Sequence, residues 1–501
     1  MNHWNHWKST AVFLSLILLT GCESLTPHRI SARLEERGEC GKLLVRMDEA
    51  VAKTGVGDAS SYPVPGFPYL RADRFLAAVG KYAKEEEQRE QWAEMMRQLD
   101  LGARKKELRS LPPGELFDSS GRTAAAQADD GLYANIRSCS EKLYHQDLGR
   151  AGFFEALYPQ VKVPDEYSFV LRPLGLYPLT SFPVALITKR AQQRFKGWYD
   201  TPLEKLPVFG RIERFVPAEP RRLTQDEIKS ILEVSARNPL RIPLPGDSSE
   251  KDLAAYFAPI IMQDVAGFYD RPGKMTRVRD RVTVASQDPA VYYYISYAFL
   301  HDQPILQIIY VIWYPERAGK NAPWMERGHL DGLTVRVSLD RDGRVFMVDM
   351  MNNCGCYHLF APRKGDVIYT MQENFWPGAF VPQWLPDVPP GDRLGIRVSA
   401  GWHQAQRLYA EPEQSDTKTS EYQLIPYDTL ESLPDETGKR ASIFTPTGIL
   451  AGSERIEPLI LFSMGIPSIG SMRQRGHHAI EFTERVHFDD PYLFERYFIF
   501  K

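Results

Sequence analysis

The chain has 501 residues, of which 43% are hydrophobic and 25% are charged, and its formal net charge is −3. This length exceeds that of one ordinary hydrophobic core, so two or three domains are expected, and the composition excludes a disordered or fibrous protein. The chain lacks the basic excess of a nucleic-acid-binding protein, so no nucleic-acid partner is predicted.

The most specific motif lies at the N-terminus. Residues 11–19 form an apolar run of the length found in signal peptides, too short to span a bilayer, which needs about 20 apolar residues. The run ends at Leu19-Thr20-Gly21-Cys22. This ending resembles the lipobox of bacterial lipoproteins, in which signal peptidase II cuts before a cysteine that carries a diacylglycerol. The resemblance implies a signal peptide over residues 1–21 and lipidation of Cys22. The alternative is an ordinary signal peptide with an incidental cysteine.

The same resemblance implies a location in the cell envelope. Lipoproteins carry three acyl chains, which hold them durably because each buried methylene contributes about 0.8 kcal/mol. Glu23 follows Cys22, at the position where Asp usually retains a lipoprotein in the inner membrane. We therefore expect an outer-membrane lipoprotein that faces the periplasm or the cell surface, with the membrane as a partner through its N-terminal lipid anchor. The mature region resembles uncharacterised envelope lipoproteins, a likeness that implies no activity.

The remaining cysteines are even in number. The chain has five, and lipidation of Cys22 would leave Cys40, Cys139, Cys354 and Cys356. An even set in an oxidising compartment indicates disulfides. Cys40 and Cys139 fall in two predicted helices, and we expect them as a pair.

Residues 22–155 predict a helical N-terminal domain, because apolar residues recur there every three or four positions. The predicted helices cover residues 34–53, 71–101 and 123–147. Residues 156–247 predict a Pro-rich connecting region, in which residues 158–220 favour short strands or extended loops. One helix of this region is predicted to begin after Thr224, which forms a capping box with Glu227.

Residues 248–410 predict a β domain with two hairpins, since apolar, aromatic and β-branched runs flank turn residues. The predicted strands cover residues 291–300, 305–314, 333–339, 344–350, 366–370 and 393–399. Residues 411–501 predict a segment that packs on the β domain and begins with a surface loop over residues 411–440. The predicted fold class is α+β, with a helical N-terminal part followed by a predominantly antiparallel β domain, either a sandwich or an open barrel.

Side chains suited to catalysis or metal binding gather around the second hairpin. They are His329, Asp331, Cys354, Cys356, His358 and His403. The two ends of a hairpin are neighbours, so residues that enter and leave it are expected to converge. Thiolates and imidazoles suit Zn²⁺, and a zinc site with a free position would activate water. One hypothesis is therefore a periplasmic zinc-dependent hydrolase.

Two other interpretations of these residues remain open. In a thiol enzyme, Cys354 or Cys356 would be the nucleophile and one of the three histidines its base. In the structural interpretation, the two cysteines form a disulfide or are buried thiols, and His329 and Asp331 hydrogen-bond turn backbone. We favour the structural interpretation and predict a lipid-anchored protein that binds or scaffolds, with a protein or cell-wall partner.

Overall fold

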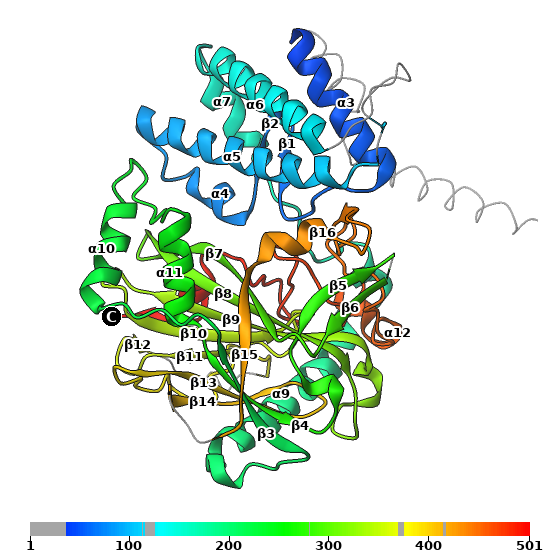
Figure 1. Ribbon diagram of the computed structural model, residues 1–501, viewed down its shortest axis with the longest axis vertical. Coiled ribbons are helices and arrows are strands. Elements are labelled where there is room, and N and C mark those ends of the chain that lie inside the picture. The colour runs from blue at the N-terminus through cyan, green and yellow to red at the C-terminus, as the bar shows by residue number, and fades with distance from the viewer. Residues whose placement is uncertain (1–36, 113, 116–125, 280, 369–374, 414–416) are drawn as a thin grey trace, which may run out of the picture.

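The computed structural model describes residues 37–112, 114–115, 126–279, 281–368, 375–413 and 417–501. The predicted signal peptide and Cys22 lie outside the described residues. Figure 1 shows a helical N-terminal part above a large sheet, with the C-terminal segment passing between them. The fold class is α+β, as predicted, and the sheet is mostly antiparallel and curls into a half-barrel.

Three long helices form the described N-terminal part: α3 (Gly38–Thr54), α5 (Glu86–Ser110) and α6 (Ala126–Leu148). Shorter elements lie among and after them, namely β1 (Tyr62–Val64), β2 (Phe67–Ala72), α4 (Arg74–Val79) and α7 (Phe153–Leu157). Met47 and Met96 are fully buried between these elements. A disulfide joins Cys40 on α3 to Cys139 on α6, so the expected pairing is confirmed.

The prediction of one helix over residues 71–101 is wrong. The chain instead forms the end of β2, then α4, then α5. Asp73 caps α4, its carboxylate accepting the backbone N–H of Leu76 at 2.7 Å. At Gly80 the chain turns against the Trp92 ring, where a Cβ atom would lie 2.9 Å from the ring. The apolar pattern is continuous across this break because α4 and α5 bury their apolar faces in the same core.

The main sheet has ten strands in the order β11-β10-β9-β8-β7-β15-β3-β4-β13-β14. Their bounds are β3 (Arg211–Pro217), β4 (Ile260–Val265), β7 (Ala290–Leu300), β8 (Gln303–Arg317), β9 (Gly328–Leu339), β10 (Val345–Asn352), β11 (Leu359–Pro362), β13 (Asp392–Val398), β14 (Ala405–Pro412) and β15 (Thr419–Pro426). Both predicted hairpins are confirmed, as β7–β8 and β9–β10. Small two-stranded sheets are formed by β5 (Lys274–Val278) with β6 (Arg281–Ala285), β12 (Val367–Ile368) with β18 (Ile499–Phe500), and β16 (Leu433–Pro434) with β17 (Arg440–Ala441).

Strand β15 corrects the prediction of a surface loop over residues 411–440. It lies in the middle of the main sheet and pairs in parallel with β3 on one side and β7 on the other. Tyr422 is fully buried there, and its hydroxyl donates to the carbonyl of Pro259 at 2.7 Å. The sequence of this strand is polar because Glu421 and Gln423 point to solvent, so it lacks the apolar run by which the other strands were predicted.

The connecting region also differs from its prediction. Residues 158–220 contain α8 (Leu171–Leu174) and the long helix α9 (Tyr177–Asp200) where short strands or loops were expected, whereas strand β3 at residues 211–217 agrees with the prediction. Pro178 stands in the first turn of α9, where its missing N–H costs nothing, and Pro183 lies further along the helix. The predicted capping box is confirmed in α10 (Gln225–Ser235), and α11 (Asp247–Phe257) follows.

Both faces of the sheet are covered along β7, β8, β9 and β10. Along β8, Ile308, Tyr310 and Ile312 point toward α10 and α11, whereas Ile309 and Trp313 point to the opposite face. That second face is covered by the C-terminal segment, which contains η5 (Tyr427–Ser432), α12 (Pro458–Leu461), η6 (Phe462–Met464) and α13 (Leu493–Tyr497). The side chains that point to this face include charged residues, which must therefore find partners inside the fold.

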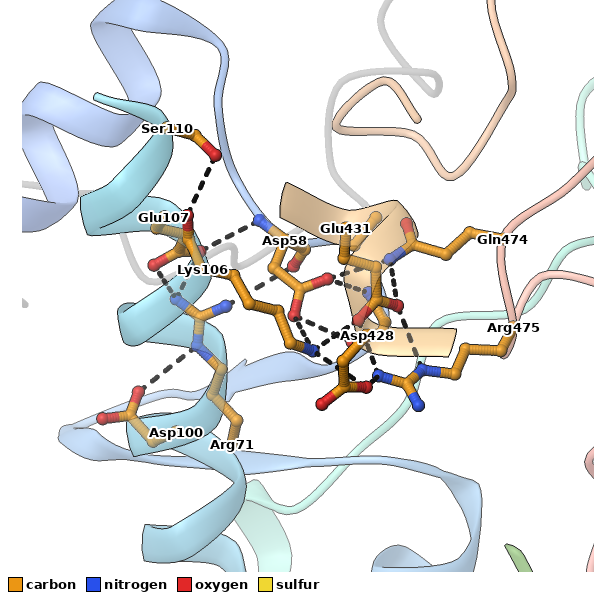
Figure 2. A network of polar contacts seen from close by, with 12 residues as sticks. Asp58, Arg71, Asp100, Lys106, Glu107, Ser110, Asp428, Glu431, Gln474 and Arg475 are labelled. Carbon is orange, nitrogen blue, oxygen red and sulfur yellow. Dashed lines mark hydrogen bonds and ion pairs between the residues drawn. The ribbon is translucent and has the colours of Figure 1, made fainter. Parts of the chain in front are cut away.

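A polar network connects the C-terminal segment to the helical part (Figure 2). Arg475 donates from Nε and Nη2 to the two carboxylate oxygens of Glu431, at 3.0 and 2.6 Å. Glu431 also accepts from Lys106 of α5 and from Gln474, and Gln474 donates to Asp58 at 2.9 Å. Burial opposes ionisation of Arg475, but the charge of Glu431 and its neighbours holds the pKa of Arg475 above its ordinary value.

The disulfide gives a first prediction. Replacing Cys40 and Cys139 together by Ser should lower the free energy of unfolding by about 2–5 kcal/mol, because the unfolded chain regains the freedom of a loop of 99 residues. Urea unfolding followed by circular dichroism measures this change. A reductant should lower the stability of the wild type and leave the double variant unchanged; equal stabilities without reductant would contradict the prediction.

The interface network gives a second prediction. Arg475→Met should destabilise the fold by about 1.5–3 kcal/mol, because the buried Glu431 loses two charge-assisted hydrogen bonds and keeps Lys106 as its counter-charge. The matched control is Arg496→Met, whose partner Glu484 is about as exposed as Arg496 itself, so the loss should stay below about 1 kcal/mol. Urea unfolding of both variants tests this difference, and equal losses would refute it.

Candidate functional site

The structure divides the six predicted site residues among separate contacts. His403 and Asp331 meet in one cluster, His358 lies in a second, and Cys354 and Cys356 lie near each other. His329 Nε2 lies 2.9 Å from the carbonyl oxygen of Val282. Within the described residues, no group of three or more His, Cys, Asp or Glu side chains is arranged to hold a metal ion. The predicted zinc site is therefore not formed by these residues.

The first cluster is centred on Arg317, the last residue of β8, and we call it the Arg317 cluster. Its other members are Asp270, Glu326, Asp331 and His403. Arg317 donates to both carboxylate oxygens of Asp331, at 2.9 and 2.8 Å, and to Glu326 Oε2 at 2.6 Å. The cluster thus connects the end of β8 to β9, to the 3₁₀ turns η3 (Phe268–Asp270) and η4 (Trp324–Glu326), and to the turn before β14.

His403 carries a positive charge in this cluster. Its Nδ1 lies 2.7 Å from Asp331 Oδ2 and its Nε2 lies 3.1 Å from Asp270 Oδ1. Because carboxylates only accept hydrogen bonds, both ring nitrogens must donate, which requires the imidazolium form. Burial acts to lower the pKa of His403, but the hydrogen bonds to Asp270 and Asp331 raise it above its ordinary value. The ring also stacks on Tyr314, with centroids 3.9 Å apart.

Asp331 is held as a carboxylate. Burial would raise its pKa, but Arg317 and the hydrogen bond from His403 together hold the pKa of Asp331 well below its ordinary value. Asp331, Asp270 and His403 are fully buried, and Arg317 is 3% exposed. A substrate in solvent therefore cannot reach these groups without displacing packed chain.

The backbone around the Arg317 cluster is strained. His403, Leu330 and Tyr357 have positive φ angles of 52°, 58° and 59°, in the left-handed region that side chains other than glycine seldom adopt. Tyr357 donates its hydroxyl to Glu326 Oε1, and Trp402 donates its ring N–H to Glu326 Oε2 at 2.8 Å. The ion pairs and these hydrogen bonds supply the free energy that holds these three residues in unfavourable backbone conformations.

The second cluster consists of Arg336, Asp349 and His358. Arg336 on β9 faces Asp349 on β10 directly across the strands and donates to both of its carboxylate oxygens, at 2.8 and 2.7 Å. The guanidinium also lies 3.8 Å from the centre of the Phe488 ring. Burial lowers the pKa of His358, so the neutral ring donates Nε2–H to Asp349 at 2.8 Å. Arg336 and Asp349 thus neutralise each other beneath the C-terminal segment, and His358 adds a hydrogen bond to Asp349.

Cys354 and Cys356 are free thiols, not a disulfide. The hydrogen bond with Cys354, together with burial, raises the pKa of Cys356 well above that of an ordinary thiol. A nucleophilic cysteine needs a lowered pKa. The hydrogen bonds of the three predicted histidines in the described structure go to oxygen atoms, not to sulfur. The geometry therefore favours the structural interpretation over thiol catalysis.

Several contributors to these clusters were not predicted from sequence. Arg317, Asp270, Arg336 and Asp349 were missed, although Arg336 and Asp349 each stand between apolar residues of a strand. A charge in such a position requires a buried partner, which is a usable signal. Asp270 and His403 are far apart in the chain, and no local pattern connects them.

Glu457 was also missed. Burial and the nearby Glu326 raise its pKa to about 7. A Cβ atom at Gly470, whose φ is +84°, would lie 1.8 Å from Glu457 Oε2, so the backbone of Gly470 covers this carboxyl. A groove of about 670 Å³ lies elsewhere, between α10 and the ends of β8 and β9, and none of the six predicted residues lines it.

A different feature is accessible: an exposed apolar surface on α8, α9 and α12. We call it the apolar surface, and its residues are Phe169, Leu174, Leu176, Leu179, Phe182, Ile187, Leu459 and Ile460. Their exposed fractions range from 51% for Phe182 to 76% for Leu459. Arg172 holds the two segments together by donating from Nε to the carbonyl of Met464 at 2.9 Å, and η6 packs against α8, α9 and α12.

Comparison with known protein families, with curated proteins and with solved structures gives no match for this chain. Among the described helices, none is long and apolar enough to cross a membrane.

The charge of His403 gives a third prediction. Because its pKa is raised in the folded state, its stabilising contribution is complete below pH 6.5 and is lost as the pH rises through the raised pKa. His403→Gln should therefore be destabilised most at acidic pH, and its deficit relative to the wild type should shrink as the pH rises. Urea unfolding across this range measures the difference.

Asp331→Asn serves as the companion variant. It leaves Arg317 and His403 without their shared carboxylate, so it should destabilise the fold by about 3–5 kcal/mol. It should also reduce the pH dependence, since His403 loses one partner. A constant deficit of His403→Gln at every pH would contradict a charged His403.

Proposed function

We propose that this chain is a lipid-anchored protein of the bacterial cell envelope, whose folded body binds or scaffolds partners. The observation that carries the proposal is the disulfide between Cys40 and Cys139. Disulfides persist in oxidising compartments such as the periplasm and are rare in the cytosol. Together with the apolar run over residues 11–19 and the cysteine that follows it, the pairing supports export and acylation of Cys22.

The interior chemistry supports binding over catalysis. The buried ionisable groups of the Arg317 cluster and of the Arg336–Asp349–His358 cluster are engaged with one another. A catalytic group must instead face a substrate within hydrogen-bond reach. The proposed partners are the membrane, through the lipid anchor, and a protein or cell-wall component on the periplasmic side. Glu23 after Cys22 supports the outer membrane as the destination.

Acylation of Cys22 is the fourth prediction. Full-length protein expressed in a Gram-negative bacterium should incorporate an alkyne analogue of palmitate and fractionate with membranes. Cys22→Ser should abolish the label, because the thiol that receives the diacylglycerol is gone. The matched control, Cys356→Ser, should keep it. Equal labelling of wild type and Cys22→Ser would overturn the proposal.

A further inference from the structure

We propose that the apolar surface of α8, α9 and α12 inserts into the interface of a phospholipid bilayer that contains anionic lipid, so that the folded body lies on the membrane. The inference rests on the proposed function for the delivery of the chain to that membrane. It goes beyond lipid anchoring because it assigns a contact surface and an orientation to the folded body.

The first argument is the size and exposure of the surface. Phe169, Leu174 and Leu179 are 71%, 71% and 69% exposed, and Leu459 is 76% exposed. Isolated exposed apolar residues are ordinary, but a contiguous group on neighbouring helices marks an interaction site. Phe182 extends the surface toward Phe375 and Trp376, whose rings lie 5.5 and 5.2 Å from it. Aromatic side chains of this kind are enriched where protein meets the lipid headgroups.

The second argument is the absence of carboxylates from the exposed segment. Residues 169–187 contain one charged side chain, Arg172, and no acidic residue. Arg172 is turned inward, where it donates to the carbonyl of Met464 and lies 4.4 Å from the centre of the Tyr177 ring. The segment itself therefore presents apolar side chains outward. At its edge, the guanidinium of Arg485 lies 4.4 Å from the centre of the Phe169 ring and is paired with Asp165.

The third argument is the order of side chains along α9. On its outward face, Leu179, Phe182 and Leu186 come first and the exposed Arg190 and Arg194 follow. The opposite face buries Val184, Phe195 and other residues against the fold. Cations that border an exposed apolar surface can reach the anionic headgroups while the apolar side chains enter the interface. Apolar side chains next to exposed arginines match a bilayer with an apolar interior and anionic headgroups, whereas an apolar protein groove would offer the arginines no opposite charge.

The fourth argument is the tether. Residues 23–36 separate Cys22 from the first described residue, and an extended chain of this length reaches about 45 Å. An acyl group on Cys22 would therefore keep the folded body within this reach of the bilayer. Because the anchor concentrates the body at the membrane, even modest affinity of the apolar surface would fix its orientation.

Vesicle binding by the unacylated chain tests the inference. Residues 22–501 with Cys22→Ser include the whole described fold and carry no acyl group. This protein should cosediment with vesicles of phosphatidylethanolamine and phosphatidylglycerol. Leu179→Glu with Phe182→Glu should weaken binding at least about tenfold, because two apolar contacts are replaced by charges. Arg190→Glu with Arg194→Glu should weaken binding to these vesicles and leave any binding to pure phosphatidylcholine vesicles unchanged.

Matched controls keep the test specific. Val234→Glu with Val278→Glu changes two residues that are each 55% exposed and lie outside the apolar surface, so it should bind vesicles like the parent protein. Circular dichroism should show the same fold for all variants. The inference is overturned if the parent protein does not bind vesicles, or if Leu179→Glu with Phe182→Glu binds as well as the control. It is also overturned if light scattering shows a dimer that those two substitutions dissociate without any vesicle binding.

The outcomes separate this inference from the proposed function. Vesicle binding without acylation of Cys22 in cells would support the contact surface and refute the lipid anchor. Acylation of Cys22 without vesicle binding would support the anchor and refute the contact surface.

Discussion

Burial of both faces of the main sheet along β7, β8, β9 and β10 is the constraint on which the rest of the structure depends. These strands are covered by α10 and α11 on one side and by the C-terminal segment on the other. Charged side chains on either face are therefore shielded from solvent. An internal charge therefore needs an opposite charge or backbone hydrogen-bond partners, because an unpaired ion in this environment would cost several kcal/mol. Arg336 and Asp349 satisfy this requirement as direct cross-strand neighbours. Arg317 and Asp331 satisfy it at the end of β8.

The C-terminal segment makes this burial complete. Its strand β15 joins the two halves of the sheet, and its later residues cover the second face. It also reaches the helical part through Arg475 and Glu431, which meet Lys106 and Asp58 in the network of Figure 2. The helical part, the sheet and the C-terminal segment are thus coupled by buried charge. A segment whose sequence predicts a surface loop at its start is central to the assembly of the fold.

The interior and the exterior of the protein differ in their chemistry. Inside, the ionisable groups of the Arg317 cluster and of the Arg336–Asp349–His358 cluster are paired with one another, so their arrangement supports stability. Outside, α8, α9 and α12 expose large apolar side chains whose partners are not part of the described chain. An apolar surface bordered by cations would add a contact between the folded body and the membrane to the attachment that a lipid anchor provides. The proposed lipid anchor and the proposed membrane contact therefore depend on different parts of the chain and can be tested independently.

The sequence by itself determined the features that local patterns encode. The hairpins β7–β8 and β9–β10, the capping box at Thr224 and the helices that carry Cys40 and Cys139 follow from periodicity, turn residues and capping chemistry. The acylation motif at Cys22 is likewise local and remains a prediction. Tertiary structure decided which residues meet. His403 joins Asp331 and Asp270 from distant segments, and the polar strand β15 enters the sheet because its neighbours offer free hydrogen-bonding edges. Such pairings depend on chain topology, which sequence spacing does not record.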